Sequence, residues 1–401
     1  MVISSENKRM GVLFSSIFLV GVGFSIIMPV LPYYAESLGA NAFQLGLLMT
    51  VYAICQFIFA PVWGAYSDRV GRRPVLLAGI LGFGITFILF GYATQLWMLY
   101  LIRIIGGSLS CATMPTAMAY AADSTSLEKR GPAMGMIGAA MGMGMIFGPA
   151  IGGLLSGISL SFPFVFAGIL ALLNAAAAWR LLPESLPQEK RSREKQKIQR
   201  ASLLQGIKSP FAVLFFVLML ASIGESIHQG TYALFTEAKL GFTARDIGWS
   251  FTAAGVISAM VQGMLTGKMI NRLGEEKTAS IGITLLGLSF ILFIFTFNIP
   301  SSIVFMGVFA AGTGLIRPSI SAAVSKRTLG AQGSAMGILQ GYDSLGRAIG
   351  PSLGGFMLDQ ALNMNYYTAI VIALLALVTL LSGSRQMPAA VINSDQEPMG
   401  D

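Results

Sequence analysis

Charged side chains are scarce in this sequence: Asp, Glu, Lys and Arg make up 11% of the 401 residues, and 54% are hydrophobic. Soluble domains usually carry about 25% charged residues, because these groups are the ones best suited to face water. The mean hydropathy of +0.71 reflects the same deficit. A water-soluble fold is therefore excluded, and the sequence predicts an integral membrane protein whose outer surface faces lipid.

The residue types that build metal and disulfide sites are also nearly missing. The chain has one histidine, His228, and two cysteines, Cys55 and Cys111, each within an apolar run. A His/Cys metal site or a disulfide framework is therefore not expected. Glycine-rich loops for nucleotide phosphates are missing as well, so we expect no cofactor. Any active transport would then have to draw its energy from an ion gradient.

Long apolar runs dominate the sequence instead. A helix rises 1.5 Å per residue, so about 20 apolar residues cross the ~30 Å hydrocarbon layer of a membrane. Twelve such runs lie near 11–33, 43–66, 75–95, 97–122, 132–157, 162–182, 210–235, 247–270, 278–298, 301–325, 333–357 and 366–383. The sequence therefore predicts an all-α membrane protein with twelve transmembrane helices.

The net charge of +8 follows a topological pattern. If the N-terminus is cytoplasmic, 21 of the 26 Lys and Arg residues fall on the cytoplasmic side, and only Lys239 and Arg245 fall on the other. The remaining three, Arg103, Arg317 and Arg347, lie within spans. By the positive-inside rule we expect both termini in the cytoplasm. The basic charge therefore gives no reason to expect a nucleic-acid partner.

The longest interruption of the apolar pattern divides two related halves. The stretch 64–73 returns as 267–276, and 144–153 returns as 346–355, at offsets of 203 and 202 positions. Such duplication is typical of alternating-access transporters made of two six-helix halves, with the substrate site near mid-membrane. The predicted parts are an N-terminal bundle, a cytoplasmic linker, a C-terminal bundle and a cytoplasmic tail, at 1–182, 183–209, 210–383 and 384–401.

Three motifs carry a family resemblance that covers essentially the whole chain. The loop after the second span reads Gly64-Ala-Tyr-Ser-Asp68-Arg69-Val-Gly71-Arg72-Arg73 and resembles the signature loop of the major facilitator superfamily. The glycines and Pro149 of 144–153 resemble the motif of its proton-coupled antiporters, and Arg103-Ile-Ile-Gly106-Gly107 resembles its buried-arginine motif. The resemblance points to the twelve-helix drug:proton antiporters, which include bacterial quinolone, tetracycline and multidrug exporters. It implies two pseudo-symmetric six-helix bundles.

The signature loop contains residues suited to a gate latch. Asp68 can accept hydrogen bonds from a helix N-terminus or pair with Arg69 or Arg72, and Gly71 permits a tight turn. Alternatively, the arginines only enforce topology and bind lipid headgroups. In the second half Asn271 replaces the aspartate, so the matching latch is expected to be weaker or differently wired.

Paired glycine–proline steps occur in the fifth and eleventh spans. Glycines at four-residue spacing allow another helix to approach closely, and a proline permits a bend. Ordinary helix packing is one interpretation of these glycines. Because Gly148-Pro149 and Gly350-Pro351 occupy matched positions in the two halves, we favour hinges for a rocking motion.

Charges within spans are the sharpest functional candidates, because burying one is costly and needs a partner. Arg103 and Arg317 should face the protein interior. Asp343 and Arg347 are four residues apart on one helix face and can pair, either structurally or in coupling.

Glu225 differs from Asp343 because no basic residue lies within a turn of it on its own helix. A carboxyl at mid-span can be neutral when its site is empty and ionised when a cationic substrate reaches it, as proton coupling requires. His228 and Gln229 share its helix face. Hydrogen-bonded packing is the alternative for Glu225, and His228 is equally suited to relay protons or to line the pore as a neutral ring. The resemblance also leaves open that Gln229 occupies the position of the relatives' acid.

Together these features predict a proton-coupled efflux antiporter of a bacterial inner membrane, monomeric and not an enzyme, which exports amphipathic, often cationic compounds. One alternative is a proton-coupled carrier of a metabolite, sugar or lipid. The other is a non-transporting sensor, but the linker and tail are too short to hold a signalling domain. The expected substrate contacts are Phe18, Tyr52, Gln56, Arg103, Met114, Gln229, Tyr232 and Arg317. The expected proton-coupling residues are Glu225, His228 and Asp343. The expected gating residues are Asp68, Arg69, Arg72, Gly148, Pro149, Gly350 and Pro351.

The charge distribution predicts the accessibility of engineered cysteines. A cysteine introduced at Gly39 or Asn363 should react with an impermeant thiol reagent added outside intact cells, and one at Ser192 should not. Labelling of the Ser192 site under the same conditions would contradict the predicted topology.

Overall fold

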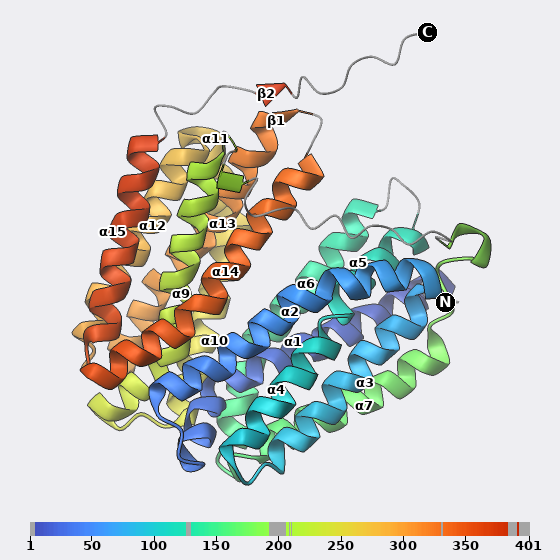
Figure 1. The fold of residues 1–401 in the computed structure, drawn as a ribbon, viewed down its shortest axis with the longest axis horizontal. Coiled ribbons are helices and arrows are strands. Elements are labelled where there is room, and N and C mark those ends of the chain that lie inside the picture. The colour runs from blue at the N-terminus through green and yellow to red at the C-terminus, as the bar shows by residue number, and fades with distance from the viewer. Residues whose placement is uncertain are drawn as a thin grey trace. The chain divides into compact units, whose positions relative to one another are not determined.

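The computed structural model describes residues 5–125, 130–191, 206–207, 209, 211–329, 332–383 and 391–392 (Figure 1). Up to residue 191 the elements are α1 (Ser5–Ser37), α2 (Ala42–Val70), α3 (Arg72–Gly91), α4 (Leu96–Ser110), α5 (Thr113–Ser124), α6 (Arg130–Leu155), α7 (Phe162–Leu181) and the 3₁₀ turn η2 (Gln188–Lys190). From residue 211 onward they are α9 (Ala212–Leu240), α10 (Ala244–Met260), the π-helical η3 (Val261–Thr266), α11 (Gly267–Leu273), α12 (Glu275–Ile294), α13 (Ile299–Arg327), α14 (Gln332–Gln360) and α15 (Met364–Gly383). Two strands of two residues, β1 (Thr328–Leu329) and β2 (Val391–Ile392), pair in parallel.

The predicted all-α membrane fold is confirmed. In the described ranges, eleven helical segments are long and apolar enough to cross a membrane. One of them combines α4 and α5, which are separated by a turn, and another combines α10, η3 and α11. The twelfth predicted span, 333–357, is helix α14, which falls outside this set because Gln340, Asp343 and Arg347 lower its hydropathy.

Asparagine N-caps begin two of the helices, and a glycine turn recurs at corresponding positions of the two halves. Asn41 begins α2 and Asn298 begins α13, each as an N-cap whose side-chain oxygen accepts a hydrogen bond of 2.8 Å from the backbone N–H three residues later. Gly71 (φ 116°) separates α2 from α3, and Gly274 (φ 84°) separates α11 from α12. Residues with a Cβ rarely adopt such φ values, so the tight turn predicted at Gly71 is confirmed.

The chain forms two compact units. The first contains Met1–Gln199 together with Tyr232–Gly255, and the second contains Arg200–Thr231 together with Val256–Asp401. Helix α9 therefore contributes to both. The predicted boundaries of the linker (183–209) and tail (384–401) stay predictions, because most of these residues lie outside the described ones.

Within the first unit, α1 packs against α6 and α7, and α3 packs against α4 and α7. Aromatic rings from α3 and α7 pack together inside this unit: Phe83 stacks on Phe87 at 4.0 Å between centroids, and Phe90 lies 4.9 Å from Phe164. In the second unit, α12 packs against α13 and α15, and α14 packs against α13 and α15.

Glycines let α1 and α6 touch through their backbones. A Cβ at Gly144 would lie 2.5 Å from the carbonyl oxygen of Phe18, and one at Gly152 would lie 2.5 Å from that of Ile26. The Ser25 hydroxyl donates a hydrogen bond of 3.0 Å to the Gly144 carbonyl. The close helix approach predicted from the glycine spacing is therefore confirmed in this half.

The same packing recurs between α9 and α14. A Cβ at Gly346 would lie 2.5 Å from the carbonyl oxygen of Met219, and one at Gly350 would lie 2.7 Å from that of Ile223. The repeat seen in the sequence thus corresponds to a repeated helix contact.

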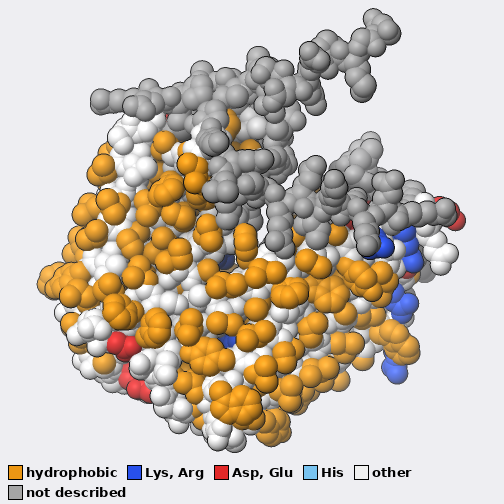
Figure 2. Space-filling view, viewed as in Figure 1, with side chains coloured by type: hydrophobic (Ala, Val, Ile, Leu, Met, Phe, Trp, Pro, Cys, Tyr) orange, Lys and Arg blue, Asp and Glu red, His pale blue; other side chains and the backbone are white. Residues whose placement is uncertain are grey.

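Hydrophobic side chains cover most of the described surface drawn in Figure 2, and charged ones are few. Leu173, Val304 and Val378 are among the large apolar residues that expose more than 60% of their surface. A surface of this kind is suited to contact with lipid tails.

The glycine contacts predict a sharp difference between two alanine substitutions on α6. Gly148→Ala should destabilise the protein by about 1–3 kcal/mol, because its Cβ would overlap the Ser25 hydroxyl. Gly142→Ala should be nearly neutral, since its Cβ would meet nothing within 4 Å. Thermal melting in detergent measures both, and equal melting temperatures would contradict the packing described.

Candidate functional site

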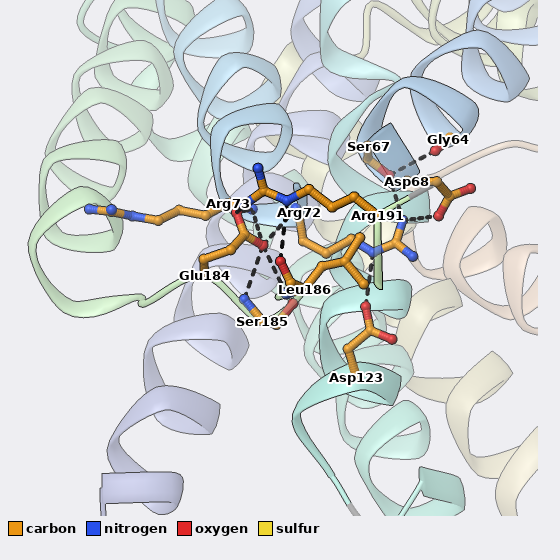
Figure 3. A network of polar contacts seen from close by, with 10 residues as sticks. All are labelled: Gly64, Ser67, Asp68, Arg72, Arg73, Asp123, Glu184, Ser185, Leu186 and Arg191. Carbon is orange, nitrogen blue, oxygen red and sulfur yellow. Dashed lines mark hydrogen bonds and ion pairs between the residues drawn. The ribbon is translucent and has the colours of Figure 1, made fainter. Parts of the chain in front are cut away.

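The loop between α2 and α3 forms a polar network around Arg72 (Figure 3). The guanidinium contacts Asp68 of α2 at 2.5 Å and donates to Asp123 of α5 at 2.9 Å and to the Ser67 hydroxyl at 2.7 Å. Its side chain is only 11% exposed. The predicted ion pair of Asp68 is therefore formed with Arg72, while Arg69 is exposed. One arginine thus joins two helices through two carboxylates.

The first turn of α3 is capped by Glu184, which the sequence analysis did not single out. Its carboxylate accepts hydrogen bonds from the backbone N–H of Arg72 at 2.8 Å and of Arg73 at 3.3 Å. It also accepts from the N–H groups of Ser185 and Leu186, at 3.0 Å each. A negative charge is stabilised at a helix N-terminus. The carboxylate that caps the N-terminus of α3 is therefore that of Glu184, and not that of Asp68 as the sequence suggested.

Further contacts dock the beginning of the predicted linker on the first unit. The Tyr120 hydroxyl donates to the Pro183 carbonyl at 2.8 Å, and Arg191 lies 3.8 Å from the Glu184 carboxylate. The Arg73 guanidinium donates to the carbonyl of Trp179 in α7. A Cβ at Gly71 would collide with the Glu184 carboxylate, so the glycine is needed for space as well as for its φ.

The corresponding loop of the second unit forms a different ion pair, as the sequence predicted. Glu275 follows Gly274 and pairs with Lys326 of α13 at 3.1 Å. The lysine side chain is 73% exposed, so solvent screens this pair strongly.

Asp343 lies at the centre of a charge network in the second unit, and its own side chain is only 2% exposed, whereas those of Arg317 and Arg347 are 37% and 47% exposed. Its four donors come from three helices: the Ser222 hydroxyl at 2.6 Å, Arg317 at 2.8 Å, Arg347 at 3.2 Å and the Gln340 amide at 3.3 Å. The pair predicted between Asp343 and Arg347 is confirmed, and Arg317 is an additional partner.

Glu225 belongs to the same network. Its carboxylate lies 3.8 Å from Arg317 and accepts a hydrogen bond of 3.1 Å from the Gln229 amide. The observation that Glu225 lacks a cation therefore holds along its own helix but not across helices. Two carboxylates here share the Arg317 guanidinium, and with Arg347 the formal charges of the network balance. A cavity lined by Ser222, Glu225, Thr313 and Arg317 adjoins it, with room for about one water molecule.

His228 lies in an aromatic cluster of the second unit. Its ring is fully buried, with its centroid 4.4 Å from those of both Phe293 and Phe309. Its Nδ1 lies 3.2 Å from the Tyr366 hydroxyl. A charged imidazolium would be costly among these rings. Of the two roles left open by the sequence, this placement favours that of a neutral, packed ring.

Arg103 lies in the interior of the first unit. It is only 6% exposed, and its guanidinium carbon lies 5.0 Å from the ring centroid of Tyr52 and 5.1 Å from that of Phe90. The Tyr52 hydroxyl is hydrogen-bonded to that of Ser110 at 2.9 Å, and it also interacts with Gln56. Arg103 therefore faces the protein interior, as expected.

The other predicted substrate contacts are apolar or aromatic. Phe18 lies edge-on to Phe147 at 6.4 Å, and Tyr232 is buried against Phe251 at 5.6 Å. Met114 packs against the core of the first unit. The structure thus assigns the candidate residues to two groups. Phe18, Tyr52, Gln56, Arg103, Met114 and Tyr232 belong to the first unit, and Glu225, His228, Gln229, Arg317 and Asp343 belong to the second.

The glycine–proline step of α6 contacts α10 within the first unit. A Cβ at Gly248 would lie 2.5 Å from the Pro149 carbonyl oxygen, and one at Gly153 would lie 2.9 Å from that of Ala244. The segment predicted to act as a hinge is therefore packed against backbone on two sides, by α1 and by α10.

Comparison with known proteins gives a consistent result. The model of the Major Facilitator Superfamily matches residues 13–224 and 214–398. Multidrug resistance protein 2 of Bacillus subtilis (strain 168) is 30% identical over 397 residues, which cover 98% of this chain and 99% of that protein. The class D tetracycline resistance protein of Salmonella ordonez is 34% identical over 346 residues, 84% of this chain and 86% of that protein. The crystal structure of the nucleoside transporter NupG superimposes with a TM-score of 0.78 over 96% of this chain and 99% of that one; at 14% identity it shows the fold alone.

The network around α3 predicts separate effects for its two acids. Glu184→Gln should destabilise the first turn of α3 by about 1 kcal/mol, because its N–H groups lose a charged acceptor. Asp68→Asn should leave this turn intact and slow transport, because Arg72 loses one of its two carboxylates. Hydrogen exchange of peptides covering 72–76 and a transport assay measure the two effects. Glu189→Gln, at an exposed position of the same segment, is the control and should change neither.

Proposed function

Because the chain belongs to the major facilitator superfamily, we propose that it is a proton-coupled antiporter that exports amphipathic, often cationic organic compounds by alternating access. Membership of the family makes it a membrane transporter and not an enzyme. The names of its multidrug- and tetracycline-resistance relatives support the direction and breadth of transport. The observation that supports proton coupling is the charge network in which Asp343 and Glu225 share Arg317.

The two carboxylates of this network differ in how firmly they are held. Both oxygens of Asp343 are occupied by donors, so a proton added there would displace one of them. Glu225 is 26% exposed, and its contact with Arg317 at 3.8 Å is longer than a hydrogen bond. We therefore assign proton binding and release to Glu225, and a fixed counter-charge to Asp343.

Proton exchange at Glu225 would change the balance of the network. Ionised Glu225 draws Arg317 toward it, and protonated Glu225 leaves the arginine to Asp343 alone. A cationic substrate can replace the proton as the partner of the glutamate, so cargo and proton compete for one site. A proton moving down a 100 mV potential supplies about 2.3 kcal/mol, and a pH gradient adds to this. Export against a gradient then needs no nucleotide.

The gating residues fit the same cycle. The ion pairs of Arg72 with Asp68 and Asp123 form a latch that can open and close, and Gly148-Pro149 and Gly350-Pro351 are the hinges. We place the protein as a monomer in the inner membrane of a bacterium, with both termini in the cytoplasm. Its partners are the substrate, protons and the lipid bilayer.

The assignment predicts that Glu225→Gln abolishes active export while the protein stays folded. Glutamine keeps the size and the hydrogen bond to Gln229 but cannot release a proton. Drug accumulation in everted vesicles with an imposed pH gradient measures export, and Glu189→Gln is the control for an exposed glutamate.

Asp343→Asn should behave differently, because it leaves Arg317 and Arg347 with a single carboxylate between them. Both arginines are partly exposed, at 37% and 47%, so solvent screens part of the loss. This variant should therefore lose about 1 kcal/mol of stability, as well as transport. If Glu225→Gln still builds a drug gradient, the coupling role belongs to Asp343 or His228 instead.

A further inference from the structure

A proline interrupts the backbone hydrogen bonds of α13 next to a charged residue. Pro318 lies inside this helix and directly follows Arg317. Proline has no backbone N–H, so the carbonyl four residues earlier loses the donor that a regular helix would give it. In α13 this carbonyl belongs to Gly314, which is buried. An unpaired buried carbonyl is costly, so this oxygen needs a donor from elsewhere.

Thr266 of η3 supplies that donor. Its hydroxyl donates to the Gly314 carbonyl at 3.2 Å, and its side chain belongs to a residue only 2% exposed. The glycine makes this approach possible, because a Cβ at Gly314 would lie 3.2 Å from Cγ1 of Val261 in η3. The break that the proline makes in one helix is thus closed by a side chain of another.

The π-helical turn of η3 changes the acceptors of this hydroxyl. In regular helices of this protein, Thr252 and Thr284 each donate to the carbonyl four residues earlier. The Thr266 hydroxyl instead lies 3.0 Å from the carbonyl of Val261, five residues earlier. Its single hydrogen is shared between this carbonyl and that of Gly314. Short π-helical segments are frequent at functional sites, and this one is joined to the proline break.

The turn of α13 that precedes the proline belongs to the charge network of the second unit. Arg317 lies 2.8 Å from Asp343 and 3.8 Å from Glu225. Ile316 and Arg317 both line the small cavity beside Glu225. Helix α12 touches the same turn, since a Cβ at Gly282 would lie 2.8 Å from Cγ1 of Ile316. A change of bend at the proline would therefore alter the distance of the arginine from both carboxylates.

We propose that Thr266 is a positioning residue for proton coupling, because it closes the break at Pro318 and thereby fixes Arg317. The arginine is thus held between Asp343 and Glu225. The inference rests on the proposed antiport function, in which the arginine moves between the two acids as the proton on Glu225 comes and goes. Thr266 acts on this step through the backbone of α13 and does not bind the proton itself.

Export of the cationic dye ethidium from everted vesicles with an imposed pH gradient tests the positioning role. Thr266→Val keeps the shape of the side chain and removes the hydroxyl. It should lower kcat about tenfold and change KM by less than about twofold, since the cation binds Glu225 whereas proton release needs Arg317 in place. Thr266→Ser keeps a hydroxyl and should restore most of kcat. Thr278→Val is the control at a buried threonine whose hydroxyl donates to the Gly274 carbonyl at the start of its own helix, and it should keep wild-type kinetics.

Double-mutant cycles measured by thermal melting test the contact without transport. Thr266→Val should lower the melting temperature by about 2 °C, because the Gly314 carbonyl loses its donor. Pro318→Ala restores a backbone N–H for the same carbonyl, so in that background Thr266→Val should have little effect, whereas Thr278→Val should act equally in both. In an Arg317→Gln background the effect of Thr266→Val should also be smaller, since no guanidinium is left to position.

The positioning role is refuted if Thr266→Val exports ethidium at the wild-type rate, or if its effect on melting is the same with and without Pro318. A wild-type protein that builds no ethidium gradient would refute the proposed function instead. The melting cycles would then decide the role of Thr266, because they do not depend on transport. Coupling to both Pro318→Ala and Arg317→Gln would support positioning, and coupling to Pro318→Ala alone would reduce Thr266 to a contact between helices.

Discussion

A charge buried among apolar helices must find its partner inside the protein, and the polar architecture of this chain depends on that constraint. Arg72 satisfies it with Asp68 and Asp123, and Asp343 with Arg317 and Arg347. Each of these two sets of ion pairs joins helices that are distant in the sequence. Because breaking one such pair leaves another charge unpaired, these contacts are suited to a protein that must exchange one set of partners for another during a cycle.

Glycine contacts provide the framework that holds these charges in place. Gly144 and Gly152 bring α6 onto the backbone of α1, and Gly346 and Gly350 bring α14 onto that of α9. The duplicated halves therefore keep the same helix contacts but differ in charge. The first unit has a doubly paired arginine at its α2–α3 loop, and no carboxylate oxygen of the described residues lies within 4 Å of Arg103. In the second, the corresponding loop carries an exposed pair and the interior carries a balanced network.

Much of this could be predicted from the sequence, because apolar length, repetition and local spacing are properties of the chain alone. The spans, the turn at Gly71 and the pair of Asp343 with Arg347 four residues later belong to this class. The capping of α3 by Glu184 does not, since the two are separated by 112 residues and a short Pro–Glu–Ser segment carries no signal for the helix it caps.

The approach of Arg317 to Glu225 was missed for the same physical reason. Spacing along one helix shows which side chains share a face, but it does not show which neighbouring helix lies opposite that face. Along its own helix Glu225 is a lone carboxyl, whereas α13 supplies its cation. Similarly, the ring contacts that enclose His228 come from α12, α13 and α15, and nothing in the sequence around residue 228 indicates them.

That enclosure has a practical consequence. His228 is the only histidine in the chain, so its imidazole resonances are assigned without mutagenesis. Stacking on Phe293 and contact with Phe309 and Tyr366 expose it to strong ring currents from three different helices. Nuclear magnetic resonance of a sample labelled only in histidine would therefore report changes in the packing of the second unit through a single native spectroscopic probe.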